Sequence, residues 1–278
     1  MNPRFTTSAR VVVASALLLF AGAAGAESFR IGGTGAALGT MRVLGEEFRK
    51  TRPGLEYEVL PSLGSAGGIR AVLASAIDIG VSARLLKPEE LAAGAVQTSV
   101  GTTPFVFAVA ATSKVTALSS ADLVDIYAGK KTRWPDGSPV RLFLRGPSGA
   151  EIELLYSISP QMKAAHLLAE KRPGLLTTAT DQENADALES IPGAIGVIGF
   201  AQLVSEKRSL QALQIDGVAP TPAALREGSY RLSVPLYLVT GARPSPRARE
   251  FIAFTRSTAG TALLSRNGYL VPAPGEAR

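Results

Sequence analysis

The chain of 278 residues contains no cysteine and only one histidine. The absence of cysteine excludes disulfide bonds, thiolate metal sites and cysteine nucleophiles. A single histidine argues against histidine-based metal sites and histidine-dependent catalytic triads. Aromatic residues make up only 6% of the chain, which disfavours a carbohydrate site, where several rings usually stack on the sugar. We therefore expect neither a bound metal nor another cofactor.

The chain also lacks strong charge of either sign. It has 29 basic and 23 acidic side chains, a formal net charge of +6, and no long block of lysine and arginine. A mild excess of positive charge favours an anionic partner, and the lack of a basic block argues against nucleic acid. Hydrophobic residues reach 46%, and a chain of this length can form two domains.

Residues 1–26 have the pattern of a cleaved secretory signal. Arg4 and Arg10 supply positive charge, Val11–Phe20 is apolar, and Ala24-Gly25-Ala26 has the small residues of a cleavage site. The apolar run is too short to span a bilayer comfortably. We expect cleavage near Ala26 and an exported mature protein.

Beyond the signal, short apolar runs alternate with amphipathic segments, a pattern typical of α/β folds with mostly parallel strands. The predicted strands are Phe29–Ile31, Tyr57–Leu60, Ile77–Val81, Phe105–Ala111, Leu142–Leu144, Ala194–Phe200 and Leu232–Val239. The predicted helices are Met41–Lys50, Ile69–Ala76, Ser120–Tyr127, Gly149–Ser157, Pro246–Thr255 and Gly260–Asn267. No low-complexity linker separates two halves, so a two-domain protein would have to pass its chain back and forth between them.

Three loops share one pattern, in which a predicted strand is followed by a turn of glycine and hydroxyl residues and then by a helix. They are Gly32–Leu38, Gly64–Gly68 and Arg145–Ala150. Helix N-termini expose unpaired N–H groups and the positive end of the helix dipole. Each loop alone is an ordinary turn, but three of them with one arginine favour a site for a small oxyanion. None has the spacing of a nucleotide-binding loop.

Several segments share their residues, order and spacing with a known family. They are Gly64–Gly80 (GSAGGIRAVLASAIDIG), Val81–Glu90, Leu123–Trp134, the Arg145…Ser148-Gly149 motif and Pro192–Gly196. Together they resemble the periplasmic phosphate-binding proteins of ABC uptake systems, along nearly the whole mature chain.

This resemblance implies an α/β fold of the type II periplasmic-binding-protein kind. Such a fold has two lobes, with two mixed sheets flanked by helices and a hinge of two crossing strands. Lobe I would comprise residues 27–103 and 234–278, and lobe II residues 104–233. The implied function is that of a periplasmic, monomeric, non-enzymatic solute-binding protein. It would capture a small oxyanion, phosphate first, between the lobes and deliver it to an ABC permease in the inner membrane.

The ligand positions of the family can be transferred to this sequence one at a time. The serine of the second loop is Ser65 and the arginine of the third loop is Arg145. The family's hydroxyl in the first loop falls on Ala37, and its aspartate after the Gly-x-Ser step falls on Ala83. The candidate ligand-binding residues are Ala37, Leu38, Ser65, Ala83, Arg84, Arg145, Ser148, Gly149 and Ala150.

The missing aspartate affects the expected specificity. A carboxylate can accept a hydrogen bond from a protonated phosphate and repels a fully ionised anion. Glu151 is a candidate replacement, although an acid at that place also complements a helix N-terminus. The ligand is therefore phosphate bound in a different way, another oxyanion or a small organic anion.

Two other functions remain open. The alanines at positions 37, 83 and 150 also fit a binding or sensory protein with a degenerate pocket. An exported phosphatase-like hydrolase would use Ser65 or Ser148 as a nucleophile, but the sequence offers no matching histidine base. We expect His166 to be a surface or packing residue. The acids Asp181, Glu183 and Asp186 indicate a polar helix start rather than a cation site.

Overall fold

The computed structural model describes residues 29–146 and 151–271. The predicted signal segment (residues 1–26) and the predicted ligand-binding residues Ser148, Gly149 and Ala150 lie outside the described residues. The same holds for the side chain of Glu151.

The described strands alternate with helices, which confirms the predicted α/β class. The strands are β1 (Phe29–Gly33), β2 (Tyr57–Val59), β3 (Ile79–Ser82), β4 (Val96–Ala110), β5 (Ala117–Leu118), β6 (Arg141–Arg145), β7 (Leu176–Thr178), β8 (Ala194–Gly199), β9 (Leu210–Ala212), β10 (Gln214–Ile215) and β11 (Ser233–Thr240). The helices are η1 (Gly35–Ala37), α1 (Leu38–Lys50), α2 (Gly64–Leu73), α3 (Pro88–Ala92), α4 (Ser120–Ala128), α5 (Glu151–Ile158), α6 (Pro160–Glu170), α7 (Asp181–Ser190), α8 (Phe200–Ser205), α9 (Pro222–Glu227), α10 (Pro246–Thr255) and α11 (Thr258–Arg266).

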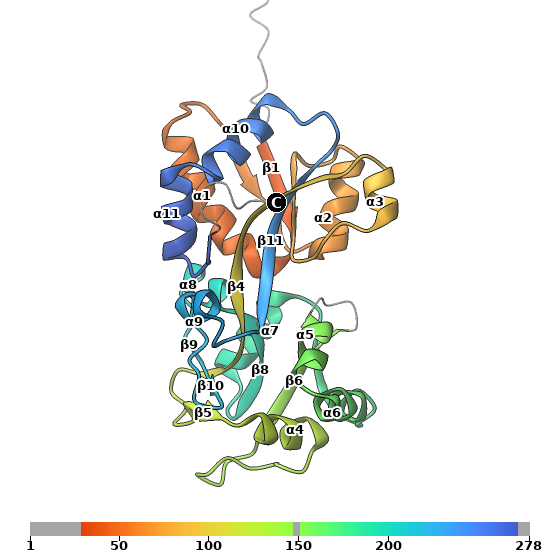
Figure 1. Ribbon diagram of the computed structural model, residues 1–278, viewed down its shortest axis with the longest axis vertical. Coiled ribbons are helices and arrows are strands. Elements are labelled where there is room, and N and C mark those ends of the chain that lie inside the picture. Colours follow the sequence, from red (N-terminus) through yellow and green to blue (C-terminus); the bar gives the residue numbers. More distant parts are fainter. Residues whose placement is uncertain (1–28, 147–150, 272–278) are drawn as a thin grey trace, which may run out of the picture.

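Nine of the described strands form one continuous mixed sheet, in the order β2-β1-β3-β11-β4-β8-β6-β7, with β9 also paired to β4. The family resemblance implies two mixed sheets, and the long strand β4 joins them into one. Its first part pairs with β11 as far as Pro104, and from Phe105 onward it pairs with β8. Figure 1 shows β4 and β11 running side by side between an upper and a lower body.

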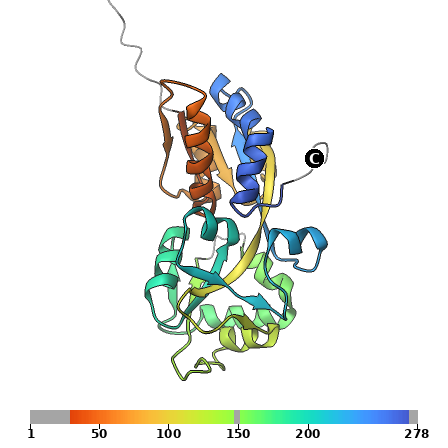
Figure 2. The ribbon, with the colours of Figure 1, turned by 90° about the vertical axis from the view of Figure 1, so that its left-hand side faces the viewer.

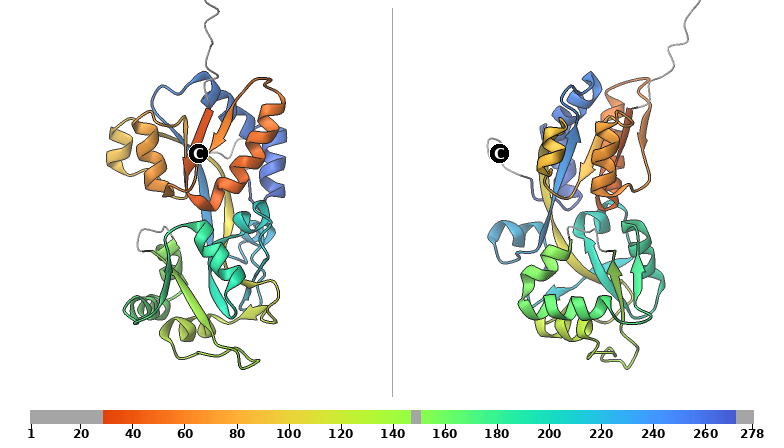
Figure 3. Two further views of the ribbon diagram at one scale, coloured as in Figure 1. Left: turned by 180° about the vertical axis from the view of Figure 1, so that it is seen from behind. Right: turned by 90° about the vertical axis from the view of Figure 1, so that its right-hand side faces the viewer.

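Separate hydrophobic clusters occupy the two bodies. One cluster packs α1, α10 and α11 against β1, β3 and β11, and includes Phe29, Phe48 and Phe251. Two others pack α4–α7 against β4, β6 and β8 and include Phe107 and Leu188. The turned views in Figure 2 and Figure 3 also show helices covering the strands of each body.

We propose that these bodies are the two lobes expected from the sequence, with lobe I formed by 27–103 and 234–278 and lobe II by 104–233. The switch of β4 from β11 to β8 between Pro104 and Phe105 supports this boundary. The lobes also touch beside the crossing strands, where Gln182 Nε2 on α7 donates a hydrogen bond of 2.9 Å to the carbonyl oxygen of Gly35.

In two helices, residues that commonly begin or end a helix stand at the observed ends. The helix α10 has the predicted bounds, with Ser245 as its N-cap and Pro246 in its first turn. The helix α4 is capped by Ser119 and ends at Gly129, whose φ of 75° suits glycine. None of the helices formed by residues 29–146 and 151–271 has the length and apolar character of a membrane span.

His166 lies inside lobe II, which confirms the packing interpretation. Its ring stacks on Tyr127 with the centroids 6.0 Å apart and meets Tyr156 edge-on at 5.6 Å. Burial lowers the pKa of His166 below its usual 6.5, and the nearby Glu170 only partly offsets this effect. The folded protein therefore holds this ring neutral at a pH where the unfolded chain takes up a proton.

We predict that the free energy of unfolding decreases as the pH falls below about 6.5, because the unfolded chain then binds a proton that the folded chain excludes. In His166→Gln this contribution is absent, so its stability should change less between pH 7 and pH 5. Urea unfolding of both proteins at several pH values measures the difference. Parallel pH profiles would contradict this account of His166.

Candidate functional site

A cavity of about 460 Å³ lies between the proposed lobes. Lobe I contributes the N-terminal part of α2 and the turn after β3, and lobe II contributes the end of β6 and the start of α7. The crossing strand β11 contributes Val234. We call this cavity the interlobe cleft. Four of the predicted ligand-binding residues line it, namely Ser65, Ala83, Arg84 and Arg145.

Arg145 is the last residue of β6, and its side chain is only 14% exposed. Its Nη2 atom lies 3.1 Å from Oδ1 of Asp181. Within residues 29–146 and 151–271, its Nε and Nη1 atoms are buried and have no hydrogen-bond partner. Buried polar groups are normally satisfied, and leaving a charged one unpaired is costly. Among the described residues, these two atoms are therefore the candidate donors for an anion bound at Arg145.

Ser65 lies in the first turn of α2, because this helix begins at Gly64 and not at Ile69 as the sequence predicts. The segment Gly64–Gly68 is therefore helical rather than a loop. A Cβ atom on Gly68 would lie 2.7 Å from the Cα atom of Gly33, so this glycine lets α2 pack closely on β1. The Ser65 hydroxyl oxygen accepts a 3.0 Å hydrogen bond from the backbone N–H of Ala83.

The first loop enters the cleft through a different residue from those predicted. Thr34 lines the interlobe cleft, whereas Ala37 and Leu38 do not. Both are buried, because η1 and α1 turn their side chains into the protein. Ala37 instead lines a small adjoining cavity of about 20 Å³, which shares Thr34, Ala83 and Val234 with the cleft. This is roughly the size that holds one water molecule.

Arg84 lines the cleft, but its charge is already paired. Its Nη1 and Nη2 atoms donate hydrogen bonds of 2.8 and 2.7 Å to the two carboxylate oxygens of Glu90. Mainly because of these hydrogen bonds, the pKa of Glu90 is lowered to about 2. A bidentate pair of this kind satisfies most of a guanidinium's capacity for an anion. Arg84 therefore contributes less to the cleft than the sequence suggests.

Asp181 is a cleft residue that the sequence did not identify as one. It opens α7, as the predicted polar helix start requires, but it also lines the cleft beside Arg145. Glu183 and Asp186 have other roles. Glu183 completes the N-terminal cap of α7 with Thr180, and Asp186 pairs with Arg208 at 2.5 Å. In the described part of the chain, no cluster of acids and histidines is placed to hold a metal ion.

The charges that face the cleft favour an anion. Arg70, Arg84 and Arg145 are its basic lining residues, and Asp181 is its acidic one. Arg84 is neutralised by Glu90, which leaves Arg70 and Arg145 against one carboxylate. Arg70 is exposed, and Arg145 is largely buried and paired with Asp181, so the net charge of the lining is positive.

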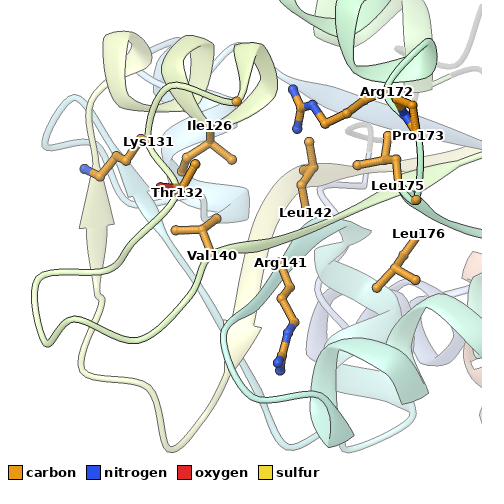
Figure 4. Close-up of a pocket in the computed structure, with 12 residues that line it drawn as sticks. Ile126, Lys131, Thr132, Val140, Arg141, Leu142, Arg172, Pro173, Leu175 and Leu176 are labelled. Carbon is orange, nitrogen blue, oxygen red and sulfur yellow. The ribbon is translucent and has the colours of Figure 1, made fainter.

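A second cavity, of about 300 Å³, lies wholly within lobe II (Figure 4). Its basic residues have partners within the protein. Lys131 pairs with Asp122, and Arg141 and Arg172 donate to the carbonyl oxygens of Pro192 and Tyr127. Figure 4 draws the head groups of Lys131 and Arg141 pointing away from its centre. The interlobe cleft is thus the better candidate site.

Comparison with known proteins agrees with this geometry. The family model described as the PBP superfamily domain matches residues 20–258. The phosphate-binding protein PstS of Borreliella burgdorferi is 22% identical over 214 residues, which cover 74% of this chain and 77% of that protein.

Solved structures show the same fold. A Clostridium perfringens structure described as a phosphate ABC transporter substrate-binding protein with bound phosphate superposes with a TM-score of 0.73. It shares 22% identity, over 88% of this chain and all of that one (100%). The periplasmic molybdate-binding protein of Azotobacter vinelandii gives a TM-score of 0.63 with 15% identity, over 88% and 100% of the two chains.

The hydrogen bond between Ser65 and Ala83 generates a testable prediction. Ser65→Ala removes the acceptor of the Ala83 N–H and should lower the free energy of unfolding by about 1 kcal/mol. Ser62→Ala is the matched control, because Ser62 also lines the cleft and its side chain forms no hydrogen bond within the described residues. Urea unfolding measures both variants. Equal stability of the two would contradict the assigned role of Ser65.

Proposed function

Since the chain belongs to the PBP superfamily and its relatives there include phosphate-binding proteins, we propose that it captures a small oxyanion, phosphate first, in the interlobe cleft. One observation carries this proposal. Arg145 lines the cleft, and its buried Nε and Nη1 atoms have no hydrogen-bond partner among the described residues. A tetrahedral oxyanion offers several acceptors to such a planar set of donors.

The cleft has further donors that suit an oxyanion. Thr34 and Thr180 both line it, one from each proposed lobe. The first turn of α2 also faces it, and the N–H groups of a first helical turn have no partners within their own helix. Closure of the lobes over the ligand would bring these two sets of donors together.

A binding protein fits this site better than a hydrolase. The Ser65 hydroxyl already accepts a hydrogen bond from Ala83, and the only histidine of the chain, His166, is buried between Tyr127 and Tyr156. A serine nucleophile needs a base within hydrogen-bond reach. We therefore assign the cleft to capture without turnover.

The proposal extends to the cellular setting of the protein. Residues 1–26 would direct export and be removed near Ala26, which places the mature, monomeric protein in the periplasm. There it would deliver its anion to an ABC permease of the inner membrane. The PstS relative of Borreliella burgdorferi is a phosphate-binding protein by name, which supports the anion of this proposal.

Isothermal titration calorimetry of the mature protein with phosphate, sulfate, molybdate and tungstate tests the proposed function. We expect saturable heat for at least one of these anions, with phosphate the first candidate. The absence of heat with all four at millimolar concentration would refute capture of an oxyanion.

Replacing the cleft arginine tests the site itself. Arg145→Ala should weaken binding by about 2–5 kcal/mol, because a buried charge pair with the ligand is lost. Arg141→Ala is the matched control, since Arg141 lies on the same strand and its exposed side chain points to the Pro192 carbonyl. A loss below about 0.5 kcal/mol for Arg145→Ala would show that the anion does not contact this residue.

A further inference from the structure

Asp181 places a carboxylate inside the proposed anion site. Its side chain is 10% exposed, and its Oδ1 atom lies 3.1 Å from Nη2 of Arg145. The other carboxylate oxygen lies against the first loop of lobe I, because a Cβ atom on Gly35 would come within 2.6 Å of it. The carboxylate is thus held between the guanidinium of one lobe and the backbone of the other.

The N-terminal cap of α7 does not account for this carboxylate. The hydroxyl oxygen of Thr180 accepts from the N–H of Glu183. The carboxylate of Glu183 accepts in turn from the N–H groups of Ala179 and Thr180. Among the described residues, Arg145 is the only ion-pair partner of Asp181. The carboxylate of Asp181 is therefore held by its ion pair with Arg145, at the lining of the cleft.

A bound oxyanion and Asp181 would have to share one guanidinium. Arginine has five N–H donors in a planar array, so Nε and Nη1 can hold a ligand while Nη2 keeps the carboxylate. The two negative groups would then lie a few ångströms apart in a partly buried site. Like charges at such a distance repel, more strongly in the protein than in water.

We propose that Asp181 is an internal counter-anion, which neutralises Arg145 before a ligand arrives and then lowers the affinity of the cleft for anions. This rests on the proposed function, because it assigns a role to a residue of the same site. The carboxylate acts on any oxyanion at Arg145 through its charge. It therefore sets the strength of capture rather than the choice between anions of equal charge.

The test is the replacement of the carboxylate by its uncharged isostere. In Asp181→Asn, we expect phosphate and sulfate to bind at least about tenfold more tightly than to the unchanged protein, which is about 1.4 kcal/mol. Asp186→Asn is the matched control. This variant removes the same charge from the same helix, but at a side chain that is 67% exposed and pairs with Arg208. We expect it to bind phosphate and sulfate with affinities within about twofold of those of the unchanged protein.

Several outcomes would overturn the role of Asp181. If both anions bind Asp181→Asn as before or more weakly, the carboxylate only orients Arg145. If phosphate binds Asp181→Asn more weakly while sulfate binds it more tightly, the carboxylate accepts a hydrogen bond from protonated phosphate and selects that anion. Asp181→Ser, a smaller uncharged replacement, should tighten binding in the same direction and covers the case that Asp181→Asn does not fold.

The same titrations separate this inference from the proposed function. If the unchanged protein binds phosphate and Asp181→Asn binds it no more tightly, the inference fails and capture stands. If only Asp181→Asn binds, the inference stands and capture by the unchanged protein fails. Binding by neither protein overturns both.

Discussion

The interlobe cleft depends on one constraint, the need to neutralise a guanidinium that the fold buries. Arg145 ends β6 with a largely buried side chain, where an unpaired charge is strongly unfavourable. Asp181 pairs with Nη2, and the buried Nε and Nη1 atoms have no hydrogen-bond partner among the described residues. The pair with Asp181 stabilises this half-paired arginine in the fold, and its other two nitrogen atoms are the ones that we propose bind the anion.

The sheet topology explains why this arginine meets its partner. Strands β6 and β7 are parallel and pair Arg145 with Thr178, so both chains leave the sheet at the same edge. The chain after β7 reaches the start of α7 within three residues, which places Asp181 beside Arg145. In lobe I, β1 and β3 are also parallel, and the turns that follow them supply Thr34 and Ala83 to the cleft. Ligand sites of open α/β sheets form at such carboxyl ends of strands.

Local signals made much of the fold predictable. The alternation of apolar strands with amphipathic helices indicated the α/β class, and the predicted bounds of α10 agree with the structure. The start of α2 was missed because Gly64, Gly67 and Gly68 have low helix propensity, and packing of Gly68 against Gly33 overrides it. The long strand β4 was only half recognised, because its first half is less buried than its second.

The site was predictable only in part. Arg145 and Ser65 followed from the motifs, and both line the cleft. Asp181 was interpreted as a helix start, because no local pattern reports that α7 begins next to the end of β6. The pairing of Arg84 with Glu90 depends likewise on the path of the turn between them. Contacts between separate stretches of chain come from topology, which single-sequence patterns specify weakly.

A crystal structure of the mature protein with inorganic phosphate tests the central claim most directly. The account predicts an anion in the interlobe cleft, within hydrogen-bond distance of the Nε or Nη1 atoms of Arg145. An anion bound elsewhere, or a cleft in which protein side chains occupy those donors while phosphate is saturating, would contradict it.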